Sequence, residues 1–157
     1  MSKIDYDILT AAQSSINPLE ERELDLRGLK IQKIDNLTLT HDQNDCLNLT
    51  NNDITHLDNL SFLPNLKTII LSNNRLVKLS KNLVKYIPNL KVLIANNNNV
   101  SNIGDLDPLK DLELTDLCLL DNPVYLLNYY RLYLIHSIPS LKTLDFKRIK
   151  EKVCFFN

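Results

Sequence analysis

The sequence feature that most limits the fold is a repeated spacing of leucine and asparagine. The template L-x-x-L-x-L-x-x-N-x-L, in which other apolar residues can replace leucine, fits residues 44–54, 66–76, 90–100 and 114–124 in register, and 44–54 departs only at its first position. Degenerate copies flank these four, at 23–31 and 141–149. The first apolar residues of the six expected strands are at positions 24, 47, 69, 93, 117 and 144, so the period is about 24 residues.

This period is typical of leucine-rich repeats, and it predicts an α/β fold. Leucines at alternate positions of a short strand face one side, which a single repeat cannot bury alone. Neighbouring repeats therefore stack into a right-handed solenoid with a parallel sheet on its concave face. We expect strands centred near residues 25, 48, 70, 94, 118 and 145.

The expected organisation is one leucine-rich-repeat domain over residues 1–157. It comprises an N-terminal cap (1–19), five repeats (20–124), a C-terminal cap (125–150) and a tail (151–157). Each end repeat lacks one neighbour, so each needs a cap. We expect a helix over 5–16, with Ile8, Leu9, Ala12 and Ile16 near one side, and another over 126–137, whose apolar stripe is Leu127, Tyr130, Leu134 and Ile138.

Four asparagines hold the same phase in the template, namely Asn52, Asn74, Asn98 and Asn122. Each falls where the chain turns out of a strand, and its amide can both donate and accept hydrogen bonds. These four predict a structural asparagine ladder that satisfies the backbone groups freed by the turn. For most of the other asparagines, simple solvation of loops is an adequate interpretation.

The sequence argues against catalysis, metal binding and a bound cofactor. Its three histidines, at 41, 56 and 136, are isolated, and Gly28 and Gly104 are too far apart for a phosphate-binding loop. The three cysteines are too few for a disulfide framework and predict reduced thiols, and the apolar runs are too short to span a membrane. The net charge of −1 argues against broad electrostatic capture of nucleic acid.

The concave face of the expected sheet is the natural place for a protein partner, because its strand side chains point away from the core. Contiguous exposed apolar side chains rimmed by polar ones indicate such a partner, and a helix fits this groove best. The alternative is that β-branched residues are there only as good strand formers. The residues expected on this face are Glu23, Asp25, Arg27, Cys46, Asn48, Thr50, Thr68, Ile70, Ser72, Val92, Ile94, Asn96, Asp116, Cys118, Leu120, Thr143, Asp145 and Lys147.

Basic residues gather near the first repeat and in the last part of the chain. We expect them to make supporting contacts to RNA phosphates, which position a nucleic acid without reading its sequence. Solvated surface charge is the equally open alternative. The residues assigned to this group are Arg27, Lys30, Lys147, Arg148, Lys150 and Lys152.

Several motifs resemble the A-prime family of the U2 small nuclear ribonucleoprotein. The segments RELDLRG at 22–28 and GDLDPL at 104–109 narrow the resemblance to the A-prime family. The segments YRLY at 130–133 and LDF at 144–146 are less specific, because they belong to a cap shared by many leucine-rich-repeat proteins. The resemblance covers residues 3–150. The sequence departs from the family at Leu29, where an aromatic residue is expected, and at 125–128, which is unusually apolar.

This resemblance implies a non-catalytic scaffold of the spliceosome in the nucleus. It implies that the concave groove binds a helix of B-double-prime, an RNA-recognition-motif protein, and that the pair holds a stem-loop of U2 RNA. The alternative is another intracellular capped leucine-rich-repeat adaptor, of the phosphatase-regulating or acidic nuclear phosphoprotein type.

Overall fold

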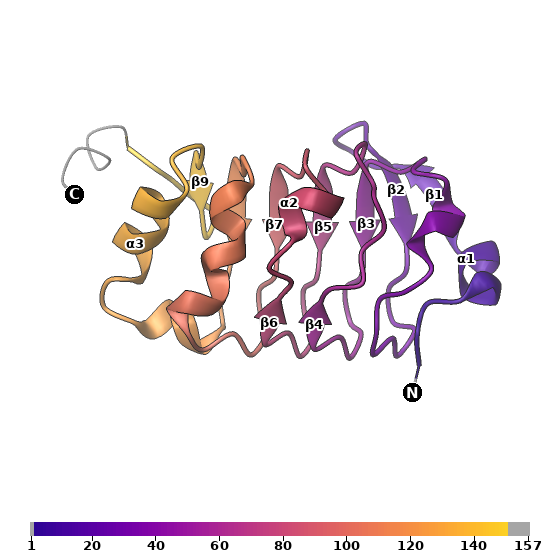
Figure 1. The fold of residues 1–157 in the computed structure, drawn as a ribbon, viewed down its shortest axis with the longest axis horizontal. Helices are drawn as coiled ribbons and strands as arrows, with labels where there is room; N and C mark the ends of the chain where they lie inside the picture. The colour runs from indigo at the N-terminus through magenta and orange to yellow at the C-terminus, as the bar shows by residue number, and fades with distance from the viewer. Residues whose placement is uncertain (1, 151–157) are drawn as a thin grey trace.

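The computed structural model describes residues 2–150, and its main feature is an eight-stranded sheet (Figure 1). Neighbouring strands of this sheet follow one another along the chain, and the six inner strands pair in parallel. The outermost strand at each end pairs antiparallel with its neighbour. The strands are β1 (Gln13–Ile16), β2 (Arg22–Asp25), β3 (Cys46–Asn48), β5 (Thr68–Ile70), β7 (Val92–Ile94), β8 (Asp116–Cys118), β9 (Thr143–Leu144) and β10 (Lys147–Arg148).

The predicted α/β solenoid of leucine-rich repeats is confirmed, and the predicted strand centres lie within or next to the observed parallel strands. The parallel register places Leu24, Leu47, Ile69, Leu93 and Leu117 opposite one another, and all five are buried. Each strand thus buries its central side chain against the same layer of the neighbouring repeats. This layer belongs to one continuous hydrophobic core over the length of the sheet.

The side of the solenoid opposite the sheet consists of short helices and turns. Figure 1 shows these segments in front of the strands, with the N-terminal end of the chain at the right and α3 at the left. A small parallel sheet of two strands, which the repeat pattern did not predict, lies along the lower edge in this view. The remaining elements are α1 (Tyr6–Ala11), η1 (Leu37–Thr40), β4 (His56–Leu57), β6 (Lys78–Leu79), α2 (Leu83–Tyr86), η2 (Ile103–Asp111), η3 (Pro123–Leu126) and α3 (Tyr130–Ser137).

The N-terminal cap differs from the predicted helix over 5–16. The helix α1 begins after Asp5, whose side chain accepts the N–H of Ile8, and it ends at Ala11 because Ala12 adopts an extended conformation. Residues 13–16 form β1 and pair with β2, so backbone hydrogen bonding at the sheet edge outweighs continuation of the helix. As a result Ile16 is 63% exposed and not part of the core.

The C-terminal cap is a helix, as predicted, but it is shorter than 126–137. Residues 123–126 form the separate turn η3, and the extended backbone of Leu127 divides this turn from α3. Tyr130, Leu134 and Ile138 are buried as predicted, and Leu127 is partly buried against the same core. In residues 2–150, no helix is both long enough and apolar enough to cross a membrane.

Candidate protein-interaction surface

The parallel register brings the side chains expected on the concave face into rows that run across the strands. One row contains Asn48, Ile70, Ile94 and Cys118, which are directly opposite one another on β3, β5, β7 and β8. Opposed residues of adjacent strands lie about 5 Å apart, so Ile70 and Ile94 form a continuous apolar pair. The concave face, as the term is used below, comprises the outward positions of β2, β3, β5, β7 and β8 together with the residues that follow them.

Two rows flank this central row. Glu23, Cys46, Thr68, Val92 and Asp116 are opposite one another at the other outward position of the strands. The second flanking row lies just after the strand ends. Backbone hydrogen bonds still connect successive repeats there, and the N–H of Asn73, for example, donates to the carbonyl of Asn96 at 3.1 Å. This row contains Arg27, Thr50, Ser72, Asn96 and Leu120.

The concave face is less exposed than the sequence suggested. Cys46, Asn48, Thr68 and Cys118 are buried, so the half-buried apolar residues are Ile70, Val92, Ile94 and Leu120. The apolar strip available to a partner is therefore centred on β5 and β7.

Both cysteines of the described chain are free thiols with little exposure. Burial raises the pKa of the Cys46 thiol well above its ordinary range, and the carboxylates of Glu23 and Glu21 raise this pKa further. The Cys46 Sγ lies 3.5 Å from Glu23 Oε1. A raised pKa disfavours the thiolate, so Cys46 is a packing residue and not a reactive nucleophile.

Acidic side chains surround the N-terminal part of the concave face, but they are not equivalent. The carboxylate of Asp25 accepts two hydrogen bonds from the Arg27 guanidinium, at 2.9 and 3.0 Å. These bonds hold the pKa of Asp25 below its usual value. Glu21, in contrast, accepts the Thr68 hydroxyl at 2.7 Å, so its carboxylate reaches β5. The charge of Asp25 is largely neutralised, whereas Glu21 and Glu23 keep a negative potential over the sheet.

The four template asparagines have side chains that connect one repeat to the next. The amide nitrogen of Asn74 donates to the carbonyls of Leu49 and Leu71, at 2.9 and 3.0 Å, and its Oδ1 accepts the N–H of Ile54 at 3.1 Å. Asn52, Asn98 and Asn122 are buried in the same way. Among residues 2–150, every buried side-chain nitrogen or oxygen has a hydrogen-bond partner.

The structure contains a second row of regularly spaced asparagines. Their presence had been explained by solvation of the loops, so this row was not predicted. Asn51, Asn73 and Asn97 precede the ladder residues, and all three have φ values between 54° and 59°. The amide of Asn97 donates to Asn73 at 2.8 Å, and that of Asn73 donates to Asn51 at 2.9 Å. Asparagine tolerates this left-handed conformation better than most residues, and this explains its repetition at the site.

The basic residues expected near RNA lie at opposite ends of the eight-stranded sheet. Arg27 and Lys30 follow β2, while Lys147 and Arg148 form β10 at the other edge. Arg27 is engaged with Asp25, and Lys150 is exposed after β10. Lys152 lies outside the described residues. The sheet does not bring these side chains into one basic patch.

Asp145 was expected on the concave face, and this prediction is wrong. Its side chain is buried, where Oδ1 accepts the N–H of Leu119 at 2.7 Å and Oδ2 accepts the hydroxyl of Tyr130 at 2.9 Å. The aspartate therefore joins the last full repeat to the helix of the C-terminal cap. Burial raises the pKa of the Tyr130 hydroxyl, which remains a proton donor at neutral pH.

Two residues beside the concave face were not predicted from the sequence. Leu19 lies in the turn between β1 and β2, and Phe146 lies in the turn between β9 and β10. Both line an apolar hollow of about 250 Å³ on the concave face, together with Val92, Ile94 and Cys118. The available signal was an apolar residue inside an otherwise polar turn.

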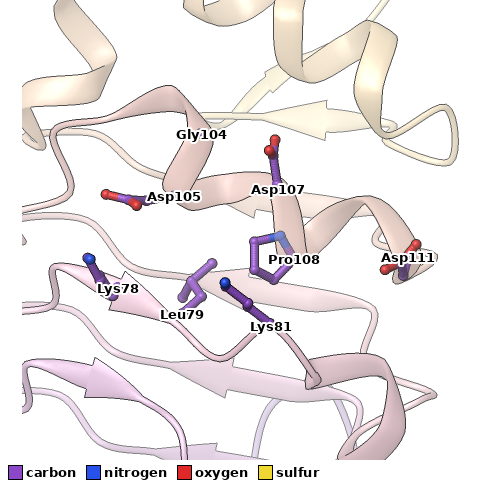
Figure 2. Close-up of a pocket in the computed structure, with 8 residues that line it drawn as sticks. All are labelled: Lys78, Leu79, Lys81, Gly104, Asp105, Asp107, Pro108 and Asp111. Atoms are coloured by element: carbon purple, nitrogen blue, oxygen red, sulfur yellow. The ribbon is translucent and has the colours of Figure 1, made fainter.

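A further hollow of about 370 Å³ lies between β6 and η2, away from the concave face (Figure 2). It is lined by residues of both charges, and Figure 2 shows Asp105, Asp107 and Asp111 pointing in different directions. Asp107 is paired with Lys110 at 3.1 Å. No group of three or more metal-ligating side chains occurs in the part of the chain that the structure describes.

Comparison with known proteins assigns this architecture to a family. A family model described as leucine-rich repeat matches residues 1–154. In the crystal structure of the Drosophila melanogaster SNF/U2A' complex, a chain that is 43% identical superposes with a TM-score of 0.96, and the match covers 99% of this chain and 90% of that one. The chain belongs to the U2 A' family of leucine-rich-repeat proteins. The predicted family resemblance is confirmed.

Curated relatives in the U2 A' family share much of the sequence. The probable U2 small nuclear ribonucleoprotein A' of Drosophila melanogaster is 44% identical over 153 residues, which cover 97% of this chain and 58% of that protein. The human U2 small nuclear ribonucleoprotein A' is 41% identical over 153 residues, covering 97% and 60%. The chain thus spans about three-fifths of the length of these relatives. Their names describe components of a ribonucleoprotein particle, in agreement with the prediction that the chain is not an enzyme.

Proposed function

We propose that the protein is a non-catalytic scaffold of the U2 small nuclear ribonucleoprotein and acts in the nucleus during pre-mRNA splicing. Its concave face binds an RNA-recognition-motif protein of the B-double-prime type, and the pair holds a stem-loop of U2 RNA. The observation that carries this proposal is the apolar strip of Ile70, Val92 and Ile94 at the centre of the concave face. The likeness to a chain that was crystallised in a complex with SNF supports it.

A helix of the partner fits this strip better than a strand. The strip lies across the sheet at its middle, and the inner strands already have neighbours on both sides, so they cannot add another strand. An amphipathic helix can lay its apolar stripe along such a groove and keep its polar flanks in water. Polar neighbours on the face, such as Ser72 and Asn96, can set the register of the docked helix.

RNA is contacted mainly through the partner. The outward positions of the concave strands contain no aromatic side chain on which a base could stack, and the net charge is −1. The basic residues at the two ends of the sheet are suited to supporting contacts with phosphates. Arg27, Lys30, Lys147, Arg148, Lys150 and Lys152 are the proposed members of this group.

Isothermal titration with an RNA-recognition-motif domain of the B-double-prime type tests the proposal. Ile94→Asp places a charge at the centre of the contact, where it would be buried without a counter-ion, so binding should be abolished. The side chain points away from the core, and the repeat array should stay folded. The matched control is Lys81→Asp, on the opposite side of the solenoid, which should leave affinity unchanged. Unchanged affinity of a folded Ile94→Asp variant would place the partner elsewhere.

A pull-down from nuclear extract, followed by RNA sequencing, tests the assignment to the particle. The wild-type protein should recover U2 RNA together with its protein partner, and the Ile94→Asp variant should recover neither. Recovery of a phosphatase without U2 RNA would instead favour an adaptor of the phosphatase-regulating type.

A further inference from the structure

Phe146 occupies a backbone conformation that is unfavourable for its side chain. Residues 145 and 146 form the two-residue turn between β9 and β10, where Leu144 is paired with Lys147. Their φ values are 53° and 61°, which is the signature of a tight hairpin turn that normally contains Asn-Gly. The buried hydrogen bonds of Asp145 account for the first residue of the turn. A bulky residue at the second position is unusual, and strain of this kind often marks a functional site.

The Phe146 side chain gains no core packing in return for this strain, because it is 66% exposed. It lines the apolar hollow on the concave face that also includes Val92, Ile94 and Cys118. The hollow therefore continues the apolar strip of the proposed partner site towards the C-terminal edge of the sheet.

Leu19 lines the same hollow from the N-terminal side and is 78% exposed. Its turn is held in place, because the Oδ1 of Asn17 accepts the N–H groups of Leu19 and Glu21, at 2.9 and 3.0 Å. The Glu21 carboxylate in turn accepts the hydroxyl of Thr68 on β5. Two anchored turns, one from each end of the sheet, thus present exposed apolar side chains to one hollow.

The charges beside this hollow are negative. Asp116 lines it, and Glu21 and Glu23 lie on the N-terminal side of the concave face. Within residues 2–150, no lysine, arginine or histidine lies within ion-pair distance of these three carboxylates. The surroundings therefore suit an occupant that combines an apolar side chain with a cationic one.

We infer that Leu19 and Phe146 contact the partner's helix on two sides. An apolar side chain of that helix, its anchor, occupies the hollow between them. A lysine or arginine three or four residues from the anchor lies on the same helix face and meets Asp116. This inference rests on the proposed function and adds to it two specificity-determining residues and the chemistry of the helix that they select.

The test uses the full chain and Drosophila SNF as the probe, with binding measured by isothermal titration and stability by thermal unfolding. Phe146→Gly relieves the left-handed strain, so its unfolding midpoint should equal or exceed that of the wild type. Its dissociation constant should nevertheless rise at least tenfold, and Leu19→Ala should have a similar effect. The matched control is Phe62→Ala, because Phe62 is 64% exposed and does not line the hollow.

The outcomes separate this inference from the proposed function. If SNF binds the wild type, and the Phe146→Gly and Leu19→Ala variants bind it equally well, the proposed contact of Leu19 and Phe146 with the helix is refuted. Binding of the partner at the concave face is not refuted by that result. If Phe146→Gly lowers both stability and affinity, Phe146 is a structural residue and the inference is also overturned. If the wild type does not bind SNF, both the proposed function and the proposed contact are rejected.

Discussion

Replacing Asn98 by alanine should destabilise the solenoid more than any exposed asparagine replacement. Asn98 is 4% exposed, and its Oδ1 accepts the N–H of Leu76 at 2.9 Å. Its amide nitrogen donates to the carbonyls of Leu71 and Ala95, both at 2.9 Å. Alanine at this position removes these contacts and offers no group to replace them.

The lost contacts are not equally costly. The carbonyl of Leu71 keeps the amide of Asn74, and the carbonyl of Ala95 keeps that of Asn122. The buried N–H of Leu76 has no such second partner, and an unsatisfied buried donor costs about 1–3 kcal/mol. Each weakened carbonyl adds about 0.5 kcal/mol, at the lower end of the net value of a hydrogen bond. We therefore expect a loss of about 2–4 kcal/mol in the free energy of unfolding.

Urea unfolding followed by circular dichroism measures this loss. The matched control is Asn82→Ala, since Asn82 is exposed and precedes α2 without a side-chain capping bond, so its replacement should change stability by about 0.5 kcal/mol or less. If Asn98→Ala costs no more than Asn82→Ala, the ladder does not stabilise the repeats and the hydrogen-bond reasoning is wrong.

Further predictions concern the C-terminal cap, an ion pair and RNA. Tyr130→Phe removes a buried hydrogen bond to Asp145 and should lower the free energy of unfolding in urea by about 1–3 kcal/mol. Tyr133→Phe removes an exposed hydrogen bond and should lower it clearly less, and equal losses would refute the role of burial. Arg27→Gln should raise the pKa of Asp25 in an NMR titration, because the hydrogen bonds from Arg27 lower this pKa. The small stabilisation from the pair is present above the pKa that Asp25 has in the unfolded chain, and it is lost as the pH falls through the pKa that Asp25 has in the folded protein. The chain alone should bind a U2 stem-loop weakly in filter binding, and nanomolar affinity in physiological salt would contradict the proposed division between the two proteins.

The repeat pattern was sufficient to predict the sheet. Apolar residues with an alternating pattern and a fixed period leave only one way to bury their common face, so the strands around Leu47, Ile69 and Leu93 could be placed within one residue. The phase of Asn74 and Asn98 could be read in the same way, because a repeated turn exposes the same backbone groups each time. Tyr130 and Leu134 were also predicted as core, from their helical spacing.

Local sequence could not predict features that depend on neighbours in space. Residues 13–16 have no strong preference for strand, and they form β1 because β2 offers a free edge beside them. Cys46 and Cys118 are at outward strand positions, yet both side chains are buried in the folded chain. Asp145 occupies the phase of an outward residue, yet the hydroxyl of Tyr130 and the N–H of Leu119 draw it inward.

The periodic part of this protein follows from the repeat pattern alone, because each repeat satisfies its hydrophobic and hydrogen-bonding groups against a neighbour that has the same pattern. Only the tertiary structure could place Leu19 and Phe146 around one hollow. These residues come from turns at opposite ends of the chain, and no spacing rule connects them. Leu19 and Phe146 lie close together because the stacked repeats and the two end hairpins together set the shape of the concave face. No single repeat determines that shape.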